Sequence, residues 1–275
     1  MATFKEQVSG KTGLTFSASS TPTETQLSQF LVDGVSDVVN KTIKINPAEA
    51  MKFTTTTNST SNVTRTGQVI SVMREHNSTT IIRPCSPIPA ELRYEATDPD
   101  SLYYRSKYNP GWYELEDDIH CVPVASASSN NDIIVTQIYY DTGLAHGDSA
   151  IDNFPTEYIY LVVLYASMES CLSRMSFVEA NLPEEPILAT DISEIDTQIN
   201  NDDPEMAGVV KDKIAQQVTE HSARVAEYNA EIQKSQLEIK TLTDKYLAFS
   251  NQYNAAFGLS SNVQKRNEQS EEAQA

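Results

Sequence analysis

Apolar residues recur at helical spacing near the start of the chain. Leu27, Leu31 and Val35 lie four positions apart and therefore share one face of a helix. This pattern predicts a first helix over residues 23–45. The preceding residues 1–22 are rich in Ser and Thr and lack such a pattern, so we expect an N-terminal arm with little structure of its own.

Residues 67–141 follow a different pattern, in which short apolar runs are bounded by Pro, Gly, Asn and Ser. Runs of this kind, with polar and apolar residues in alternation, are typical of β-strands. The polar stretch before them, residues 54–66, is expected to be a loop. The pattern predicts a small β-rich insert with strands over residues 68–73, 79–82, 112–116, 119–124 and 133–140.

A second helix is predicted over residues 153–177. Pro155 suits the first helical turn. The run from Tyr158 to Ala166 is apolar on every side, which indicates burial in a core. This run has nine residues, whereas a helix needs about 20 to cross a bilayer, so no membrane partner is expected.

The C-terminal part carries the most regular pattern. From Val218 onward, residues of one stripe alternate three and four positions apart, which is a heptad repeat interrupted by the polar His221 and Ser235. The repeat predicts one helix over residues 204–257, roughly 80 Å long at about 1.5 Å per residue. Because the predicted helix contains no Gly or Pro after Val209, it is not expected to turn back on itself.

A single helix of this length cannot bury its apolar stripe alone. The stripe is therefore a candidate interface, either with other elements of the same subunit or with other subunits. The predicted interface residues are Val218, Val225, Tyr228, Ile232, Ile239, Leu242, Tyr246, Phe249 and Tyr253.

These patterns together predict an α+β fold, namely a helical bundle with a very long C-terminal helix and a small β-rich insert. The predicted segments are the N-terminal arm (1–22), the first helix and polar loop (23–66), the β-rich insert (67–141), a core helix (150–178), an acidic linker (179–203), the heptad-like helix (204–257) and a disordered tail (258–275).

The formal net charge of −18, from 38 acidic and 20 basic residues, limits the expected partners. Phosphate binding needs clustered Lys and Arg, so specific binding of nucleic acid is not expected. The stretch from Glu179 to Glu205 contains no Lys or Arg. It is either a solvated linker or a surface that repels DNA, in which case the repelling acids are Glu184, Glu185, Asp191, Glu194, Asp196, Asp202, Asp203 and Glu205.

One short sequence resembles a catalytic motif. Asp141-Thr142-Gly143 follows an apolar run, as does the active-site triplet of retroviral-type aspartic proteases. That chemistry needs two such carboxylates that share a proton. Asp, Thr and Gly are also ordinary turn residues, and we interpret the triplet as a turn.

The histidines and cysteines form no recognisable site. His146 has too few neighbouring ligands in the sequence for a metal site. His120 and Cys121 are adjacent on a predicted strand, so they point to opposite faces and cannot form a catalytic pair with each other. We predict no catalytic residue, no bound metal and no cofactor.

A cluster of aromatic residues lies between residues 103 and 113. Aromatic and cationic side chains together suit either stacking on single-stranded nucleic acid or a protein interface. Acidic residues flank the cluster on both sides, which favours an interface or a core. The cluster consists of Tyr103, Tyr104, Tyr108, Trp112 and Tyr113, with Arg105 and Lys107.

The order of elements and several short sequence segments are similar to those of a known family. The residues that carry the similarity are the apolar helix Gln26–Ile43, the insert segments Gly111–Leu115 and Ile119–Pro123, and the Phe154-Pro155 helix with Leu161–Ala166. Over residues 3–178 the chain resembles the head–tail connector, or neck, proteins of tailed bacteriophages, particularly those of marine cyanobacterial phages. The segment from Tyr228 to Phe257 is similar to helical tails in the same group.

This resemblance implies a structural, non-enzymatic virion protein: a ring-forming head-to-tail adaptor that joins the portal protein to the tail or nozzle proteins. Adaptors of this kind form twelve-fold rings, so copies of the chain are expected partners, and genomic DNA passes through the channel without specific binding. The alternative is another virion component, such as a collar whisker, fibre or baseplate protein, assembled through the C-terminal coiled coil. The expected location is the neck of the virion, after assembly in the host cytoplasm.

Overall fold

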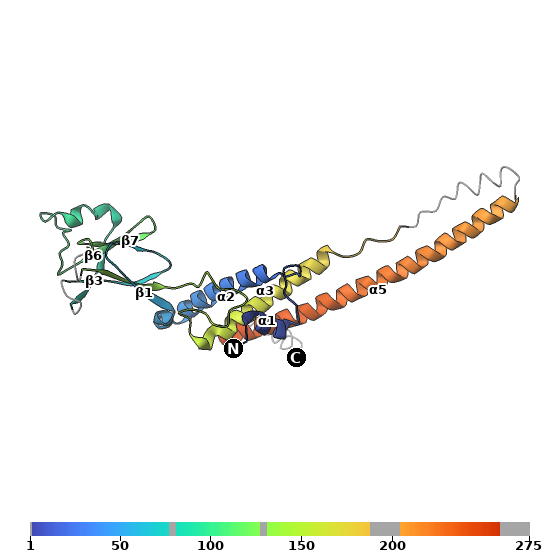
Figure 1. Ribbon diagram of the computed structural model, residues 1–275, viewed down its shortest axis with the longest axis horizontal. Coiled ribbons are helices and arrows are strands. Elements are labelled where there is room, and N and C mark those ends of the chain that lie inside the picture. The colour runs from blue at the N-terminus through green and yellow to red at the C-terminus, as the bar shows by residue number, and fades with distance from the viewer. Residues whose placement is uncertain (1, 77–80, 127–130, 188–203, 259–275) are drawn as a thin grey trace, which may run out of the picture.

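The computed structural model describes residues 2–76, 81–126, 131–187 and 204–258. Figure 1 shows three parts in a row: a lobe of β-strands, a helical bundle, and one helix that projects far beyond the bundle. The first and second helices, the β lobe and the third helix follow one another along the chain. The β lobe is thus inserted between two helices of the bundle.

The bundle contains α1 (Phe4–Thr12), α2 (Glu24–Ile45), α3 (Ile159–Ala180) and the C-terminal part of α5 (Pro204–Ala256). The predictions of α2 and α5 are confirmed to within one residue at each end, whereas α3 begins at Ile159, six residues after the predicted start, and ends three residues after the predicted end. The expectation of an N-terminal arm with little structure is wrong, because residues 4–12 form α1. A capping box starts this helix: Thr3 accepts from the backbone N–H of Glu6, whose carboxylate accepts from the N–H of Thr3.

The core of the bundle lies where α2 and α3 meet. Leu27, Leu31 and Val35 of α2 are buried, as predicted from their spacing. A Cβ atom added to Gly34 would lie 3.2 Å from Tyr165 Cδ1 and 3.3 Å from Val162 Cγ1. The two helices therefore approach each other closely because position 34 has no side chain.

The β lobe consists of two four-stranded sheets in the described part of the chain. Their orders are β1-β8-β3-β4 and β2-β7-β6-β5, and β5 pairs with β6 in parallel. Val72 and Val135 of the first sheet share a buried cluster with Ile119 and Cys121 of the second, so the sheets pack face to face. The strands are β1 (Thr54–Ser59), β2 (Val63–Thr64), β3 (Val69–Glu75), β4 (Ile82–Pro84), β5 (Ser86–Pro87), β6 (Gly111–Leu115), β7 (Asp118–Val122) and β8 (Ile133–Ile138).

The predicted fold class is wrong about the β part. The chain is a mixed α and β protein in which two sheets of substantial size stand beside the helices, and it is not a helical bundle with a small insert. The polar stretch expected to be a loop supplies β1, which pairs with β8 along its whole length. Threonine is β-branched and suits an extended backbone, so a polar strand at a sheet edge forms without an alternating apolar pattern.

Short 3₁₀ helices connect the lobe to the bundle and lie within it: Pro47–Phe53, Ala90–Leu92, Glu95–Thr97 and Thr156–Tyr158. Residues 79–80 of one predicted strand, most of the predicted acidic linker and the predicted disordered tail after Gly258 lie outside the described residues.

Helix α3 is the most apolar of the α-helices in the described chain. With the preceding 3₁₀ turn, Thr156–Ala180 is long and apolar enough to cross a membrane, by length and composition alone. An 18-residue stretch within it has a mean hydropathy of 1.2, and half of that stretch is buried inside the fold. A core helix meets the same criteria, and α3 packs against α1, α2 and α5.

Gly67 offers a test of the packing between β8 and the segment before β3. A Cβ atom at this position would lie 2.3 Å from the carbonyl oxygen of Ile138. Gly67→Ala therefore forces the backbone to shift, and we expect it to lower the free energy of unfolding by about 1–3 kcal/mol in chemical denaturation. Gly147→Ala is the matched control, since no atom lies within 4 Å of its added Cβ. Equal stability of the two variants would contradict this packing.

Candidate assembly surface on helix α5

The C-terminal part of α5 runs antiparallel to α3. Arg174 forms a salt bridge of 2.7 Å with Glu238, and the hydroxyl of Thr243 donates to Met175 Sδ at 3.3 Å. Lys245 Nζ donates to the carbonyl oxygen of Thr12 at the end of α1, at 2.6 Å. These contacts fix the register of α5 on the bundle.

A polar clamp fixes the end of α5 to α2. The hydroxyl of Tyr253 donates to Asp37 Oδ2 at 2.5 Å, and Lys41 Nζ lies 2.7 Å from the same oxygen. Lys41 Nζ also lies 4.6 Å from the centre of the Tyr253 ring. Burial, and then the hydrogen bond to Asp37, raise the pKa of Tyr253 above its usual range. The clamp therefore holds the phenol in its neutral form.

The N-terminal part of α5 leaves the bundle. Asn181, just after α3, lines a hollow together with Glu231 and Ser235, which marks the level at which α3 ends. The part of α5 before that level, residues 205–231, is called the projecting half below. It is about 40 Å long at about 1.5 Å per residue. Figure 1 shows it extending beyond α3, with no described element beside it.

Three side-chain hydrogen bonds of the projecting half, among the residues that the structure describes, join residues of α5 to each other. Gln216 bonds to Glu220, Thr219 to the carbonyl of Ala215, and Ser222 to the carbonyl of Val218. Because these polar side chains have hydrogen-bond partners within the helix, the apolar side chains are the groups that a partner would bury.

The structure divides the predicted interface residues into two sets. Leu242, Phe249 and Tyr253 are buried in the bundle core, Tyr246 packs against it, and Ile239 is half-buried. Along the same stripe, in and just after the projecting half, Val218 is 44% exposed, and Val225, Tyr228 and Ile232 are half-buried. The stripe thus serves internal packing at one end and lies open at the other.

A second exposed surface lies on the β lobe around Tyr108, which is 63% exposed. Its ring lies 5.1 Å from the ring of His76, 5.6 Å from the guanidinium of Arg83 and 5.3 Å from Lys107 Nζ. Tyr103 and Tyr104 are also exposed, whereas Trp112 and Tyr113 are half-buried in β6. The aromatic residues that are clustered in the sequence between residues 103 and 113 thus fall into an exposed set of three tyrosines and a half-buried pair in β6.

His76 and Arg83 at this second surface were missed by the sequence analysis. They belong to the β3–β4 hairpin, 32 and 25 positions before Tyr108 in the sequence, and no local spacing indicated the contact. Only the pairing of strands brings them together.

The Asp141 triplet is part of a turn. Its carboxylate accepts from the N–H of Gly143 at 3.1 Å and from the N–H of Asp152 at 3.4 Å. This agrees with the interpretation of Asp141-Thr142-Gly143 as turn residues.

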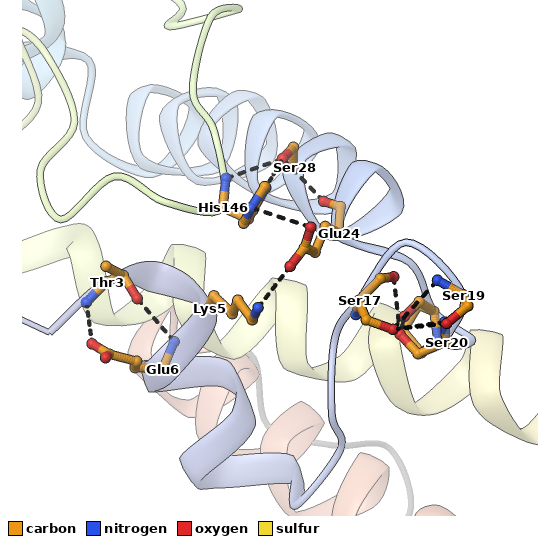
Figure 2. A network of polar contacts seen from close by, with 10 residues as sticks. Thr3, Lys5, Glu6, Ser17, Ser19, Ser20, Glu24, Ser28 and His146 are labelled. Carbon is orange, nitrogen blue, oxygen red and sulfur yellow. Dashed lines mark hydrogen bonds and ion pairs between the residues drawn. The ribbon is translucent and has the colours of Figure 1, made fainter.

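His146 joins the network of polar contacts drawn in Figure 2. Its Nδ1 lies 3.2 Å from Ser28 Oγ, and its Nε2 lies 3.8 Å from Glu24. Glu24 in turn accepts from Lys5 Nζ at 2.6 Å, which lowers the pKa of this glutamate. The network ties α1 and the loop before α3 to the start of α2, and it gives His146 a structural role.

The three cysteines are thiols in apolar surroundings. Burial raises the pKa of Cys85 to about 12 and that of Cys171 to about 11, and it also raises the pKa of Cys121. A protonated thiol is a weak nucleophile. His120 stacks on Tyr113 at 5.1 Å. Within the described ranges, no group of three His, Cys, Asp or Glu side chains is arranged to hold a metal ion.

Three of the predicted DNA-repelling acids are exposed, namely Glu184, Glu185 and Glu205. The other five lie outside the described residues: Asp191, Glu194, Asp196, Asp202 and Asp203.

The comparisons with known proteins do not identify a family for this chain. No protein-family profile matches the chain. A search of curated proteins gave no significant match.

Two leucines of α5 test the division of the helix. Leu242 is 4% exposed, whereas Leu237, on the outer face, is 65% exposed. We expect Leu242→Ala to lower the free energy of unfolding by about 2–5 kcal/mol, because it opens a cavity between α3 and α5. Leu237→Ala, the control, should change it by less than about 0.5 kcal/mol. Similar losses measured by denaturant titration would contradict the assigned faces.

The clamp at Tyr253 predicts a dependence of stability on alkaline pH. In the unfolded chain this phenol ionises near pH 10, at about its ordinary pKa, whereas in the folded chain its pKa is raised. The stability from the neutral phenol is therefore present below about pH 10 and is lost as pH rises further. Tyr253→Phe should be less stable at neutral pH by about 1 kcal/mol and lose less stability between about pH 9 and 11. Parallel pH profiles for the variant and the parent chain would contradict the clamp.

Proposed function

We propose that the chain is a structural subunit of a tailed-phage virion, a ring-forming adaptor that joins the portal to the tail and lines part of the DNA channel. The observation that carries the proposal is the open apolar stripe of the projecting half, which needs a partner to be buried. An enzyme or a carrier of small molecules does not need such a surface, whereas a subunit that works by assembly does.

The arrangement of the parts supports a joining role. The β lobe and the projecting half lie at opposite ends of the bundle, so each end is free to meet a different neighbour (Figure 1). The β lobe carries the Tyr108 surface, which has the aromatic and Arg content typical of protein interfaces. Portal and tail proteins are the neighbours proposed, and genomic DNA passes nearby.

The charge of the chain supports passage of DNA without binding. With 38 acidic and 20 basic residues, the surface repels phosphates as a whole. The exposed acids at Glu184, Glu185 and Glu205 lie at the two ends of the segment that joins α3 to α5. In the proposed ring, such acids keep DNA from adhering to the channel.

A second candidate function is favoured by the heptad repeat itself. The repeat keeps its three-and-four spacing from the buried part of α5 into the projecting half, with the polar Ser235 and His221 at two of its positions. A collar whisker, fibre or baseplate component assembled through a coiled coil uses this feature directly, with two or three helices joined along the stripe.

Electron microscopy of intact virions, with the copy number and symmetry of this chain determined, tests the proposal. We expect a ring on the tail axis directly below the portal, with the projecting half buried against neighbouring subunits. A position away from the tail axis, or a three-fold or six-fold site in the tail, would favour the second candidate. Absence of the chain from virions would contradict both.

A further inference from the structure

Two cations on the β lobe share one exposed aromatic ring. Arg83 and Lys107 lie 5.6 and 5.3 Å from the centre of the Tyr108 ring, which is exposed. Among the residues that the structure describes, neither cation forms an ion pair with an acid. This chain of 38 acidic and 20 basic residues thus carries a positive site on its surface. Such a site suits a partner that brings carboxylates with apolar groups beside them.

A segment of the complementary kind follows α3. Residues 182–187, Leu-Pro-Glu-Glu-Pro-Ile, are called the Pro-Glu segment below and belong to no helix or strand. Its two prolines favour an extended backbone. Glu184 and Glu185 are exposed and form no ion pair with a described residue. Leu182 and Ile187 are 44% and 85% exposed. The segment therefore presents two carboxylates between exposed apolar side chains.

The two surfaces match in charge and in form. Two adjacent glutamates meet two cations, and opposite charges across an interface select the partner and its orientation. Extended segments that contain proline dock on exposed aromatic rings, because their backbone loses little entropy on binding. Tyr103 and Tyr104, close to Tyr108 in the sequence, are 49% and 43% exposed and offer further rings.

The two surfaces of one chain lie too far apart to meet. Figure 1 shows the β lobe at one end of the bundle, and the end of α3, where the Pro-Glu segment begins, at the opposite end. Helix α3 lies between them, and its 22 residues span about 33 Å at about 1.5 Å per residue. A second copy of the chain can bring its own Pro-Glu segment to the β lobe of the first.

We infer that the Pro-Glu segment of one copy docks on the Tyr108 surface of the next, with its two glutamates against Arg83 and Lys107. Each copy has one surface of each kind, so the contact passes from copy to copy and closes into a ring where the rotation allows. The inference rests on the proposed ring and adds the surfaces that join its copies. The rest of the β lobe and the projecting half stay available for the portal and the tail. Because the docked glutamates face a neighbour, the repulsion of DNA falls to Glu205 and the net charge.

An exchange of charges tests the contact by sedimentation of the full-length chain. One variant carries Glu184→Lys and Glu185→Lys, and the other carries Arg83→Glu and Lys107→Glu. The parent chain should associate at about 100 μM, whereas each variant alone opposes like charges and should show a dissociation constant raised at least about tenfold. In an equal mixture, every contact between unlike copies again joins opposite charges, so we expect association to return.

The matched control carries Glu220→Lys and Glu227→Lys. Both residues are exposed on the projecting half, off the apolar stripe, and the two changes alter the net charge as much as those at the Pro-Glu segment do. This control should associate as the parent chain does. Circular dichroism checks the fold of every variant. If Arg83→Glu disturbs the β lobe, Lys107→Glu alone takes its place in the test, since this side chain is exposed.

Each outcome bears on the inference. Association that each variant loses and the mixture regains supports it, whether or not the chain is found in the neck of virions. A parent chain that stays monomeric overturns it, as does a variant that associates as well as the parent chain or a folded mixture that does not associate. The Tyr108 surface is then left for an acidic segment of another protein. The position of the chain in virions is determined separately by microscopy, so the proposed adaptor role and this contact can fail independently.

Discussion

Helix α5 buries its apolar stripe only as far along as α3 reaches. The two helices differ in length, with 22 residues in α3 and 53 in α5. From Leu242 onward the stripe belongs to the bundle core, whereas in the projecting half Val218 is 44% exposed and Val225 and Tyr228 are half-buried. The stability of most helices comes from packing of their apolar face. Because α5 is longer than α3, the apolar side chains at its N-terminal end are not packed against the bundle.

Contacts with the bundle hold the C-terminal part of α5 in place. The Tyr253–Asp37–Lys41 clamp and the bond from Lys245 to the end of α1 fix the helix at its C-terminal end. The direction of the projecting half is thereby set by the bundle. At the other end, two packed sheets carry an aromatic and cationic surface away from the helices. A molecule with exposed surfaces at both ends is suited to joining neighbours, and this is the physical basis of the proposed adaptor role.

Helices α2 and α5 were predictable because their signals are local and repeated, whereas α1 lacks such a pattern and was not predicted. The heptad repeat of α5 and the spacing of Leu27, Leu31 and Val35 give both the extent and the buried face of their helices. The size of the β lobe was missed, since β1 is a polar strand defined by its pairing with β8, far along the sequence. The surface around Tyr108 likewise depends on strand pairing. The point at which α3 stops covering α5 depends on packing in three dimensions, which spacing alone does not reveal.

Hydrogen exchange along α5, measured in dilute and in concentrated solution, tests most directly whether the helix is divided between an internal and an assembly surface. The account predicts that amides of residues 239–256 are protected at every concentration. Those of residues 211–231 should exchange rapidly in dilute solution and become protected as the chain is concentrated. Protection of residues 211–231 that does not change with concentration, or exchange of the whole helix at one rate, would contradict it.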